Sequence, residues 1–445
     1  MDPGIDWSRL GDETVERLRH YLTIDTTNPP GNEAAGTVWI ADVLAAEGIA
    51  SETAEAAPGR GNLVARLRGD GSLGGIVLHH HVDVVYADRR YWSVDPFGGV
   101  VRDGFVYGRG ALDMKSTGVL QLMAVIAIAR AGIPLKRDLI LLATGDEEAG
   151  SRFGAPFVAD HRPGWLAGAE YALSELGGID ASPGHRAPLG HIVISEKTGL
   201  PLRVTARGAP GHGSMPSPDT APHRLVRALG RLLAAERTPR VLPEVQQFFA
   251  SLAAVLPREE AAGLDDLERA LADPVRRARL LANRHWSAML RATFAVTMLR
   301  GSEKLNVIPP EAVADIDCRM LAGDDPEEIA AWVRRVIDDD HVQVEITRPP
   351  KLPNLSPPDT ELYKALASAL ARRVPGVVVA HEILVAFTDS WVFRRCGLLA
   401  YGWSPFVLDT EEWQGMHGND ERISLDNVRA GVRAYTEMLL SVAAA

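Results

Sequence analysis

The sequence predicts an α/β protein with a mostly parallel sheet flanked by helices, into which an α+β module is inserted. Three observations carry this prediction. Short aliphatic runs alternate with longer helical patterns, strands of alternating polarity begin near Gly199, and the α/β pattern resumes after about Leu355. Apolar strands separated by helices are typical of a parallel sheet covered on both faces. The 445 residues are enough for two or three folding units.

The α/β part is predicted from its apolar runs. Aliphatic residues at 76–78, 139–142 and 398–401 predict buried strands. Between the first two, residues from about 116 to 131 have a helical pattern, which a glycine and a proline end. We therefore expect a strand, a helix and a second strand in succession.

The inserted module has a different pattern. Alternating strands are expected at 201–207, 293–299, 312–320 and 342–347, with helices at about 222–235 and 326–337. Such a set is typical of two helices on an antiparallel sheet. We expect a discontinuous first domain, 1–198 and 351–445, interrupted by a second domain, 199–350. Within the second, residues of about 239–291 are rich in Ala, Leu and Arg and predict a helical insertion.

The composition excludes several classes of protein. Hydrophobic residues make up 46% and charged residues 24% of the chain, as in ordinary globular proteins. Lys and Arg number 47 against 58 Asp and Glu, which gives a net charge of −11. Because the chain is acidic and has no long basic run, we expect neither nucleic acid nor an anionic membrane as a partner. The longest apolar stretch, 119–128, is too short to span a bilayer.

The cysteines and the first residues bear on location. Cys318 and Cys396 are isolated and form neither a disulfide framework nor a Cys-based zinc site. The chain begins with acidic residues where a signal peptide has a basic and then an apolar segment. We therefore expect a soluble cytoplasmic protein.

The first chemical motif follows the strand at 76–78. In the stretch Leu-His-His-His-Val-Asp-Val-Val, at 78–85, His81 and Asp83 would project from the same face of a strand. A metal-binding histidine typically donates its other ring N–H to a carboxylate, and Asp83 is placed to accept it. A polar strand end explains this stretch equally well on its own.

Other stretches add carboxylates and a further histidine. Asp113 lies at a glycine-rich turn before a helix, and the lysine that follows has the wrong spacing for a nucleotide-binding loop. Glu147 and Glu148 directly follow a buried strand, so one could bind a metal while the other takes a proton from water. Glu175 ends another apolar run, and His417 lies in a glycine-flanked loop. Each is an ordinary polar loop if taken alone.

Together these stretches resemble the aminoacylase, desuccinylase and glutamate carboxypeptidase family of two-zinc metallopeptidases. The resemblance runs nearly end to end, with motifs in family order at 24–33, 81–85, 107–115 and 208–216 and in the loop around His417. The sequence around Glu175 and the helical insertion are more similar to the carboxypeptidase S-like and N-acyl-amino-acid hydrolase branch. The resemblance implies a zinc-exopeptidase-like catalytic domain and an inserted lid and dimerisation domain.

The resemblance also implies two Zn²⁺ ions per subunit. His81 and Glu175 match the terminal ligands of one ion, Glu148 and His417 match those of the other, and Asp113 matches the bridging carboxylate. Histidine and carboxylate ligands suit Zn²⁺, and Co²⁺ or Mn²⁺ could substitute for it.

Three further roles follow from the family pattern. Glu147 matches the general base, which takes a proton from water and returns it to the leaving nitrogen. Asp83 would orient His81. In the lid, His212 matches a histidine that stabilises the developing oxyanion in the active site of a neighbouring subunit.

Two lid residues match substrate-holding positions. Asn306 matches one of them, and we assign Arg319 to the carboxylate of the substrate, which a guanidinium can hold with two hydrogen bonds. A solvated cation at a strand end is the alternative for Arg319. Ser174 and His80 depart from the family pattern without removing a ligand.

The expected activity is hydrolysis of an amide or peptide bond beside a free amino-acid carboxylate, in a small N-acyl amino acid or short peptide, by a homodimer. A dipeptidase or an N-carbamoyl-amino-acid hydrolase on the same scaffold remains open, because the metal ligands are shared across these substrates. A non-catalytic metal-binding interaction protein is the alternative from another class. It should lack a ligand or the base, and this sequence has all of them.

Overall fold

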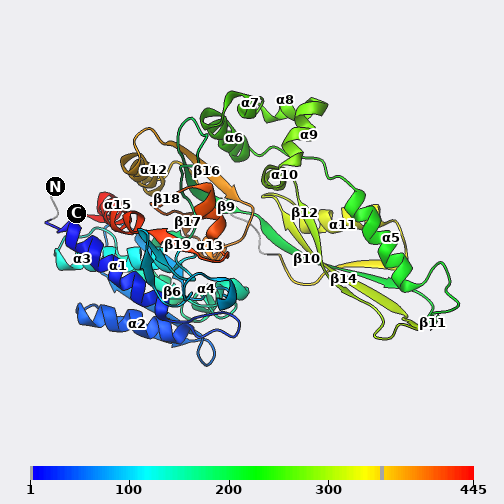
Figure 1. The fold of residues 1–445 in the computed structure, drawn as a ribbon, viewed down its shortest axis with the longest axis horizontal. Coiled ribbons are helices and arrows are strands. Elements are labelled where there is room, and N and C mark those ends of the chain that lie inside the picture. The colour runs from blue at the N-terminus through cyan, green and yellow to red at the C-terminus, as the bar shows by residue number, and fades with distance from the viewer. Residues whose placement is uncertain (1–3, 351–354) are drawn as a thin grey trace.

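The computed structural model describes residues 4–350 and 355–445. Two sheets with separate hydrophobic cores lie toward opposite ends of an elongated molecule (Figure 1). The predicted α/β body with an inserted α+β module is therefore the observed fold. The expected domain boundary at residue 351 falls on 351–354, which lie outside the described residues.

The larger sheet forms the α/β body. Within the described residues its strand order is β1-β2-β6-β3-β7-β17-β9-β8-β18, and β16 pairs with β9. The strands are β1 (Ser51–Glu55), β2 (Gly61–Leu67), β3 (Gly75–His81), β6 (Leu139–Thr144), β7 (Ala169–Ser174), β8 (Gly178–Asp180), β9 (Leu189–Glu196), β16 (Val378–Leu384), β17 (Leu399–Gly402) and β18 (Val407–Leu408). Strands β6, β3, β7 and β17 run parallel to one another, so their carboxyl ends meet at one edge.

Helices cover both faces of this sheet because its central strands are apolar on both sides. Ile76 and Leu78 of β3 belong to one core and Val77 belongs to the other, as the two-residue period of a strand requires. The first core includes α1 (Trp7–Thr23), α2 (Glu33–Ala46), α3 (Lys115–Arg130), α12 (Glu361–Arg373) and α15 (Leu425–Ala443). The second includes α4 (Ala155–His161), the 3₁₀ turn Pro163–Leu166 and α13 (Ser390–Arg395).

Helix α3 matches the helix predicted between the first two strands. Every side chain from Lys115 to Ile128 is buried. A helix that is apolar on all sides belongs inside the protein, and α3 contacts α1 and α15 as well as β3 and β6. It leads directly out of the turn that carries Asp113.

A small three-stranded sheet joins two distant parts of the body. It consists of β4 (Val100–Arg102), β5 (Phe105–Tyr107) and β19 (Arg422–Ser424), in the order β19-β5-β4 among the described residues. Arg422 pairs with Tyr107. The loop that carries His417 and the short helix α14 (Thr410–Gly415) is therefore held beside the turn that carries Asp113.

The smaller sheet has the predicted α+β architecture. Its described strands are β12 (Thr293–Arg300), β14 (Glu311–Met320), β10 (Thr198–Arg207) and β15 (Val342–Ile346), all antiparallel in that order. Helices α5 (Ala221–Ala234) and α11 (Pro326–Ile337) pack on one face, and alternate side chains of β14 are buried there. A short pair, β11 (Gly211–His212) and β13 (Val307–Ile308), extends from this sheet.

The helical insertion lies between the sheets. It contains α6 (Pro243–Val255), α7 (Arg258–Ala261), α8 (Leu267–Ala272), α9 (Pro274–Ala282) and α10 (Arg284–Leu290). Although strands of the smaller sheet (the predicted lid) flank it in the sequence, its core includes Leu189, Ala380 and Ile383 of the larger sheet. The reason is that β9 and β16 present apolar side chains to α6, which contacts both strands. The insertion therefore packs on the body, although in sequence it is part of the lid.

Among the described residues, no helix is both long enough and apolar enough to cross a membrane.

Two neighbouring arginines of α13 should differ sharply in their effect on stability. Arg394 is buried and its guanidinium lies 2.9 Å from Glu196, which is also buried, whereas Arg395 is half-exposed and pairs with exposed Asp160. Removing one partner of a buried pair costs about 3–5 kcal/mol, and an exposed pair contributes about 0–1 kcal/mol. We expect Arg394→Met to lower the free energy of unfolding in urea by several times as much as the matched change Arg395→Met. Equal effects would contradict the structural role of the Arg394–Glu196 pair.

Candidate metal centre

The carboxyl ends of three neighbouring parallel strands supply most of the candidate site. His81 ends β3, Glu148 lies in the turn after β6, and Glu175 directly follows β7. Asp113 comes from the turn before α3, and His417 from the loop after α14. Open α/β sheets place ligand sites at this edge, so five residues that are distant in the sequence lie close together.

These residues form two groups that share Asp113. Nε2 of His81 lies 2.9 Å from Oδ1 of Asp113 and 3.5 Å from Oε2 of Glu175. Nε2 of His417 lies 3.0 Å from the other oxygen of Asp113, Oδ2, and 3.2 Å from Oε1 of Glu148. In each group one possible ligand atom per residue lies within 4.8 Å of the others. This arrangement is a candidate for two metal ions bridged by one carboxylate, and we call the five residues the metal centre.

The other two histidines of the His-His-His stretch point away from the metal centre. The ring nitrogens of His79 lie 2.9 Å from the hydroxyls of Ser174 and Thr144, and Nδ1 of His80 lies 3.2 Å from Oε1 of Gln121. Burial lowers the pKa of His79 well below its usual value and that of His80 to about 3. Both therefore act as neutral structural groups.

The metal centre has the donors and the charge that a pair of divalent cations requires. Burial raises the pKa of Glu175 to about 8, and its Oε1 atom is buried with no hydrogen-bond partner among the described residues. A buried carboxylate without a partner is costly. A cation bound between His81, Asp113 and Glu175 would give this oxygen a partner, so the residues present fit the group.

Glu147 lies beside the metal centre. Its side chain is half-buried, and burial together with the negative charge of Glu175 raises its pKa well above the usual value. A carboxylate with a raised pKa can accept a proton and release it again near neutral pH. The position and the environment of Glu147 therefore suit proton transfer.

Asp83 serves the site in a different way from the one expected. His81 Nδ1 lies 2.9 Å from the backbone carbonyl of Asp83 but 3.8 Å from its carboxylate, so the carbonyl orients the ring. The carboxylate instead accepts hydrogen bonds from the backbone N–H groups of Glu147 and Glu148, at 3.2 and 3.1 Å, and from Asn28. Asp83 thus fixes the turn that carries both glutamates.

A buried network of ion pairs also supports the turn that carries Glu147 and Glu148. Arg60 Nη2 donates to Glu33 at 2.7 Å and to Asp146 at 2.6 Å, and Asp146 also accepts from Asn28. Sequence reasoning missed Arg60 and Asp146 as supporting residues. Glu33 ends the first family motif, which gave a weak signal, but Arg60 lies outside every motif.

Glu421 links the loop of His417 to the turn of Asp113, and this residue was also missed. Its buried carboxylate accepts from Arg109 Nη1 at 2.6 Å and from the backbone N–H groups of Leu112 and Asp113 at 2.7 and 3.1 Å. Arg109 in turn donates to the carbonyl of Gly418 at 2.9 Å. The adjacent acidic residues shortly after His417 were the signal that could have found it.

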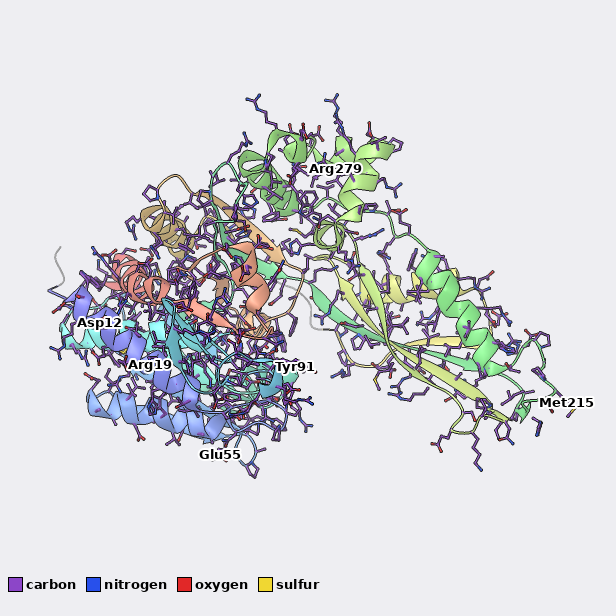
Figure 2. The ribbon with its side chains drawn as sticks, viewed as in Figure 1. Asp12, Arg19, Glu55, Tyr91, Met215 and Arg279 are labelled. Carbon is purple, nitrogen blue, oxygen red and sulfur yellow. The ribbon has the colours of Figure 1, made fainter. Side chains whose placement is uncertain are left out.

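The three residues named from the sequence on the predicted lid lie at two places on the smaller sheet. His212 is exposed on β11, where its Nδ1 lies 2.7 Å from Ser214 Oγ, and the carbonyl of Asn306 accepts from Gly213 N–H at 2.9 Å. This end of the smaller sheet is the one farther from the body, and Met215 marks it in Figure 2. Arg319 lies on β14, where its Nε donates to Asp317 at 3.0 Å.

Two curated relatives are similar over most of the chain. The N-fatty-acyl-amino acid synthase/hydrolase of Mus musculus is 29% identical over 389 residues, which are 83% of this chain and 74% of the relative. Aminoacylase-1 of Homo sapiens is 27% identical over 440 residues, which are 97% of this chain and 95% of the relative.

A solved structure has the same fold. The M20 family metallo-carboxypeptidase of Sulfolobus solfataricus superposes with a TM-score of 0.72 at 16% sequence identity, covering 97% of this chain and 99% of that one. Residues 77–441 match the profile described as peptidase family M20/M25/M40. The family that the motifs indicated is thereby confirmed, and the chain belongs to peptidase family M20/M25/M40 as a metal-dependent hydrolase of amide or peptide bonds.

Proposed function

We propose that the protein releases an amino acid from a small N-acyl amino acid or a short peptide, using two Zn²⁺ ions held by the metal centre. The observation that carries the proposal is the position of Asp113, whose two oxygens face His81 and His417 while Glu147 lies beside them. Metal-assisted amide hydrolysis by two ions needs a shared carboxylate, terminal ligands (four here) and a general base that is not itself a ligand.

The identity of the metal is argued from the donors. His81 and Glu175 would hold one ion, Glu148 and His417 the other, and Asp113 both. Nitrogen and carboxylate donors suit Zn²⁺, and Co²⁺ or Mn²⁺ are expected substitutes. When bound, such ions polarise a carbonyl and lower the pKa of water.

Proton transfer is assigned to Glu147. Its carboxylate takes a proton from the attacking water and then gives it to the leaving nitrogen, so that one residue serves both halves of the reaction. The neighbouring Glu148 faces His417 instead. The hydrogen bonds from both backbone N–H groups to Asp83 hold the two side chains in these separate positions.

The free carboxylate of the substrate is assigned to Arg319. Asn306, whose carbonyl accepts from Gly213 beside His212, is assigned with His212 to the tetrahedral intermediate. Arg319 is half-exposed on the smaller sheet, and its ion pair with exposed Asp317 is weak enough to be exchanged for a substrate. The names of the two curated relatives refer to acylated amino acids, which supports this choice over a dipeptidase or an N-carbamoyl-amino-acid hydrolase. The panel described below separates the three.

A homodimer formed through the lid would bring His212 to the active site of the partner. On α5, Val226 and Leu233 are exposed and lie seven residues apart, so they share a face, and Gly230 between them has open space around it. Met298 and Leu299 are exposed on the edge strand β12. An exposed apolar helix face, together with a strand at the edge of the sheet as far as the described residues show, fits self-association.

We also propose a cytoplasmic location. Cys318 is buried, Cys396 is exposed, and both are free thiols. Free thiols persist best in a reducing compartment.

Substrate class and metal dependence can be measured together. The protein is treated with a chelator, and amino-acid release is followed from N-acyl amino acids, N-carbamoyl amino acids and dipeptides before and after Zn²⁺, Co²⁺ or Mn²⁺ is added. We expect metal-dependent release from N-acyl amino acids. Release only from the carbamoyl compounds or only from dipeptides would replace the proposed substrate, and release that survives full removal of metal would contradict the mechanism.

Glu147→Gln should separate catalysis from metal binding. The amide keeps the shape of the side chain but cannot accept the proton, and general base catalysis contributes about 10²–10⁴-fold to a rate. We expect kcat to fall by about that factor while two metal ions per chain are retained, as measured by elemental analysis. The matched change Glu148→Gln should lower the metal content as well. A fully active Glu147→Gln protein would remove this residue from the mechanism.

Mixing two inactive variants tests whether His212 acts in the partner subunit. Each hybrid of a His212→Ala chain and a Glu147→Gln chain has one site with both residues intact if His212 is supplied by the partner. After equal mixing and subunit exchange, about a quarter of the wild-type activity should return. Exchange is followed by fluorescence transfer between labelled chains, and each variant mixed with itself is the control. No recovery after demonstrated exchange would place His212 in its own subunit or outside the reaction.

A further inference from the structure

An apolar cavity lies directly beside the metal centre. Asp113 and Glu175 form part of its wall, and most of the remainder is apolar. The apolar side chains are Leu112, Met114, Leu176, Phe406, Leu408, Trp413 and Met416. The hydroxyl of Ser404, which also lines the cavity, donates to the carbonyl of Gly177 at 3.0 Å. The cavity is thus suited to a group without polar atoms.

The walls of this cavity differ in burial. Leu112, Met114, Phe406 and Leu408 are buried in the body and form the inner part. Trp413 and Met416 are only half-buried, and they lie on or directly after the short helix α14. Met416 directly precedes the metal-centre residue His417, so the outer wall of the cavity and one of the candidate ligands belong to the same loop.

The location of the cavity indicates which part of a substrate enters it. On the proposed function, the amino-acid carboxylate is held by Arg319 on the smaller sheet, whereas the cavity lies in the body. The acyl group is on the other side of the scissile amide from that carboxylate. With the scissile carbonyl at the metal centre, the acyl group is directed toward the body and therefore toward this cavity.

We propose that this cavity binds an apolar acyl group of the substrate, and that Trp413 and Met416 limit the length of that group. The cavity has a volume of about 20 Å³, where a single water molecule needs roughly 10–15 Å³ on the same measure. A group about the size of one methyl therefore fits. A longer chain requires Trp413 to move, so this side chain determines specificity for acyl length.

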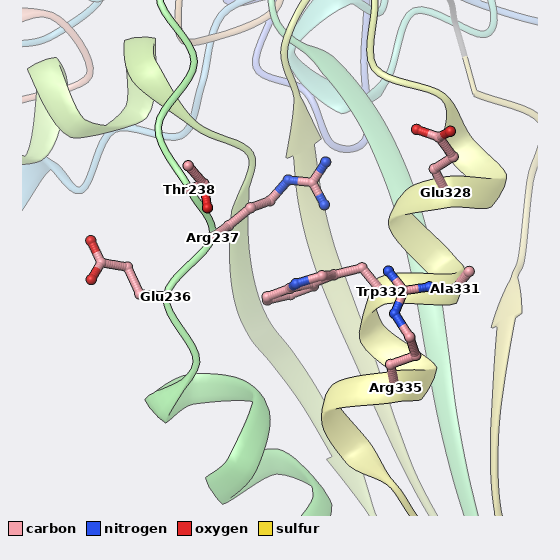
Figure 3. Close-up of a pocket in the computed structure, with 7 residues that line it drawn as sticks. All are labelled: Glu236, Arg237, Thr238, Glu328, Ala331, Trp332 and Arg335. Carbon is pink, nitrogen blue, oxygen red and sulfur yellow. The ribbon is translucent and has the colours of Figure 1, made fainter. Parts of the chain in front are cut away.

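A second hollow provides a matched control. It lies on the lid beside α11 and is lined by Trp332 with Arg237, Arg335 and two glutamates (Figure 3). Trp332 is half-buried like Trp413, but none of the metal-centre residues lines this hollow. Trp332→Ala therefore removes the same side chain without changing the cavity beside the metal centre.

The first measurement is kcat/KM for two series of substrates. One series lengthens a straight acyl chain from two to ten carbons on a fixed amino acid, and the other varies the amino acid at fixed acyl length. The wild-type protein should favour short chains. Trp413→Ala should favour longer ones, with about a fourfold gain for each methylene that becomes buried, while Trp413→Phe gives an intermediate profile. The ranking of amino acids should not change, and Trp332→Ala should match the wild type.

The second measurement does not require turnover. Binding of straight-chain carboxylates, the products of acyl release, is measured by calorimetry on the metal-loaded protein and its variants. If the affinity depends on chain length and Trp413→Ala changes that dependence, the result supports the assignment of the cavity to the acyl group. If no N-acyl amino acid is cleaved at the same time, only the proposed function is contradicted. The cavity assignment is overturned if Trp413→Ala shifts the amino-acid ranking instead. It is also overturned if Trp413→Ala, shown to be folded by circular dichroism, leaves both length profiles unchanged.

Discussion

The geometry of the metal centre depends on one carboxylate, that of Asp113. Its two oxygens face two histidines, one at the end of β3 and the other in the loop near the end of the chain. Neither histidine can shift without leaving its group. The surrounding structure therefore fixes the position of Asp113 through the backbone, since Glu421 accepts hydrogen bonds from the N–H groups of Gly110, Leu112 and Asp113. The same glutamate pairs with Arg109, so the two loops are held together.

The carboxylates of the metal centre and those around it are stabilised by hydrogen bonds and ion pairs from the rest of the body. Asp83 lies beneath the turn of Glu147 and Glu148, and burial raises its pKa to about 6. Backbone N–H groups and the amide of Asn28 stabilise its ionised form. Arg60 pairs with both Glu33 and Asp146 one step further from the metal centre. Arginine side chains thus pair with the outer carboxylates. Oε1 of Glu175 has no hydrogen-bond partner within the described part of the chain and is available to a metal ion.

The sequence predicted the parts of this structure that have a local pattern. Apolar runs located β3, β6 and β17, and the spacing of His81 and Asp83 selected one histidine out of three. The supporting residues had no such pattern. Arg60 reaches Asp146 across 86 positions and Arg109 reaches Glu421 across 312, so only the folded chain brings them together. The helical insertion was recognised from its composition, but its packing against β9 and β16 depends on apolar residues of distant strands.

The junction between the sheets explains why Arg319 and His212 lie at opposite ends of the lid. Glu196 ends β9, Lys197 separates it from β10, and the two residues are held from opposite sides. Glu196 is fixed to the body by Arg394, while Nζ of Lys197 donates to the carbonyls of Ala288 and Arg291 at 2.8 Å each.

The base of the lid is therefore anchored to both the body and the insertion. Arg319 pairs in register with Gly199, only two residues beyond Lys197, so it lies at this anchored base. His212 lies at the opposite end, beyond the last residues of β10. A lid fixed at its base can present Arg319 to the metal centre of its own chain, but it holds His212 too far away. The proposed sharing of His212 between subunits would thus follow from where the chain crosses from one sheet to the other.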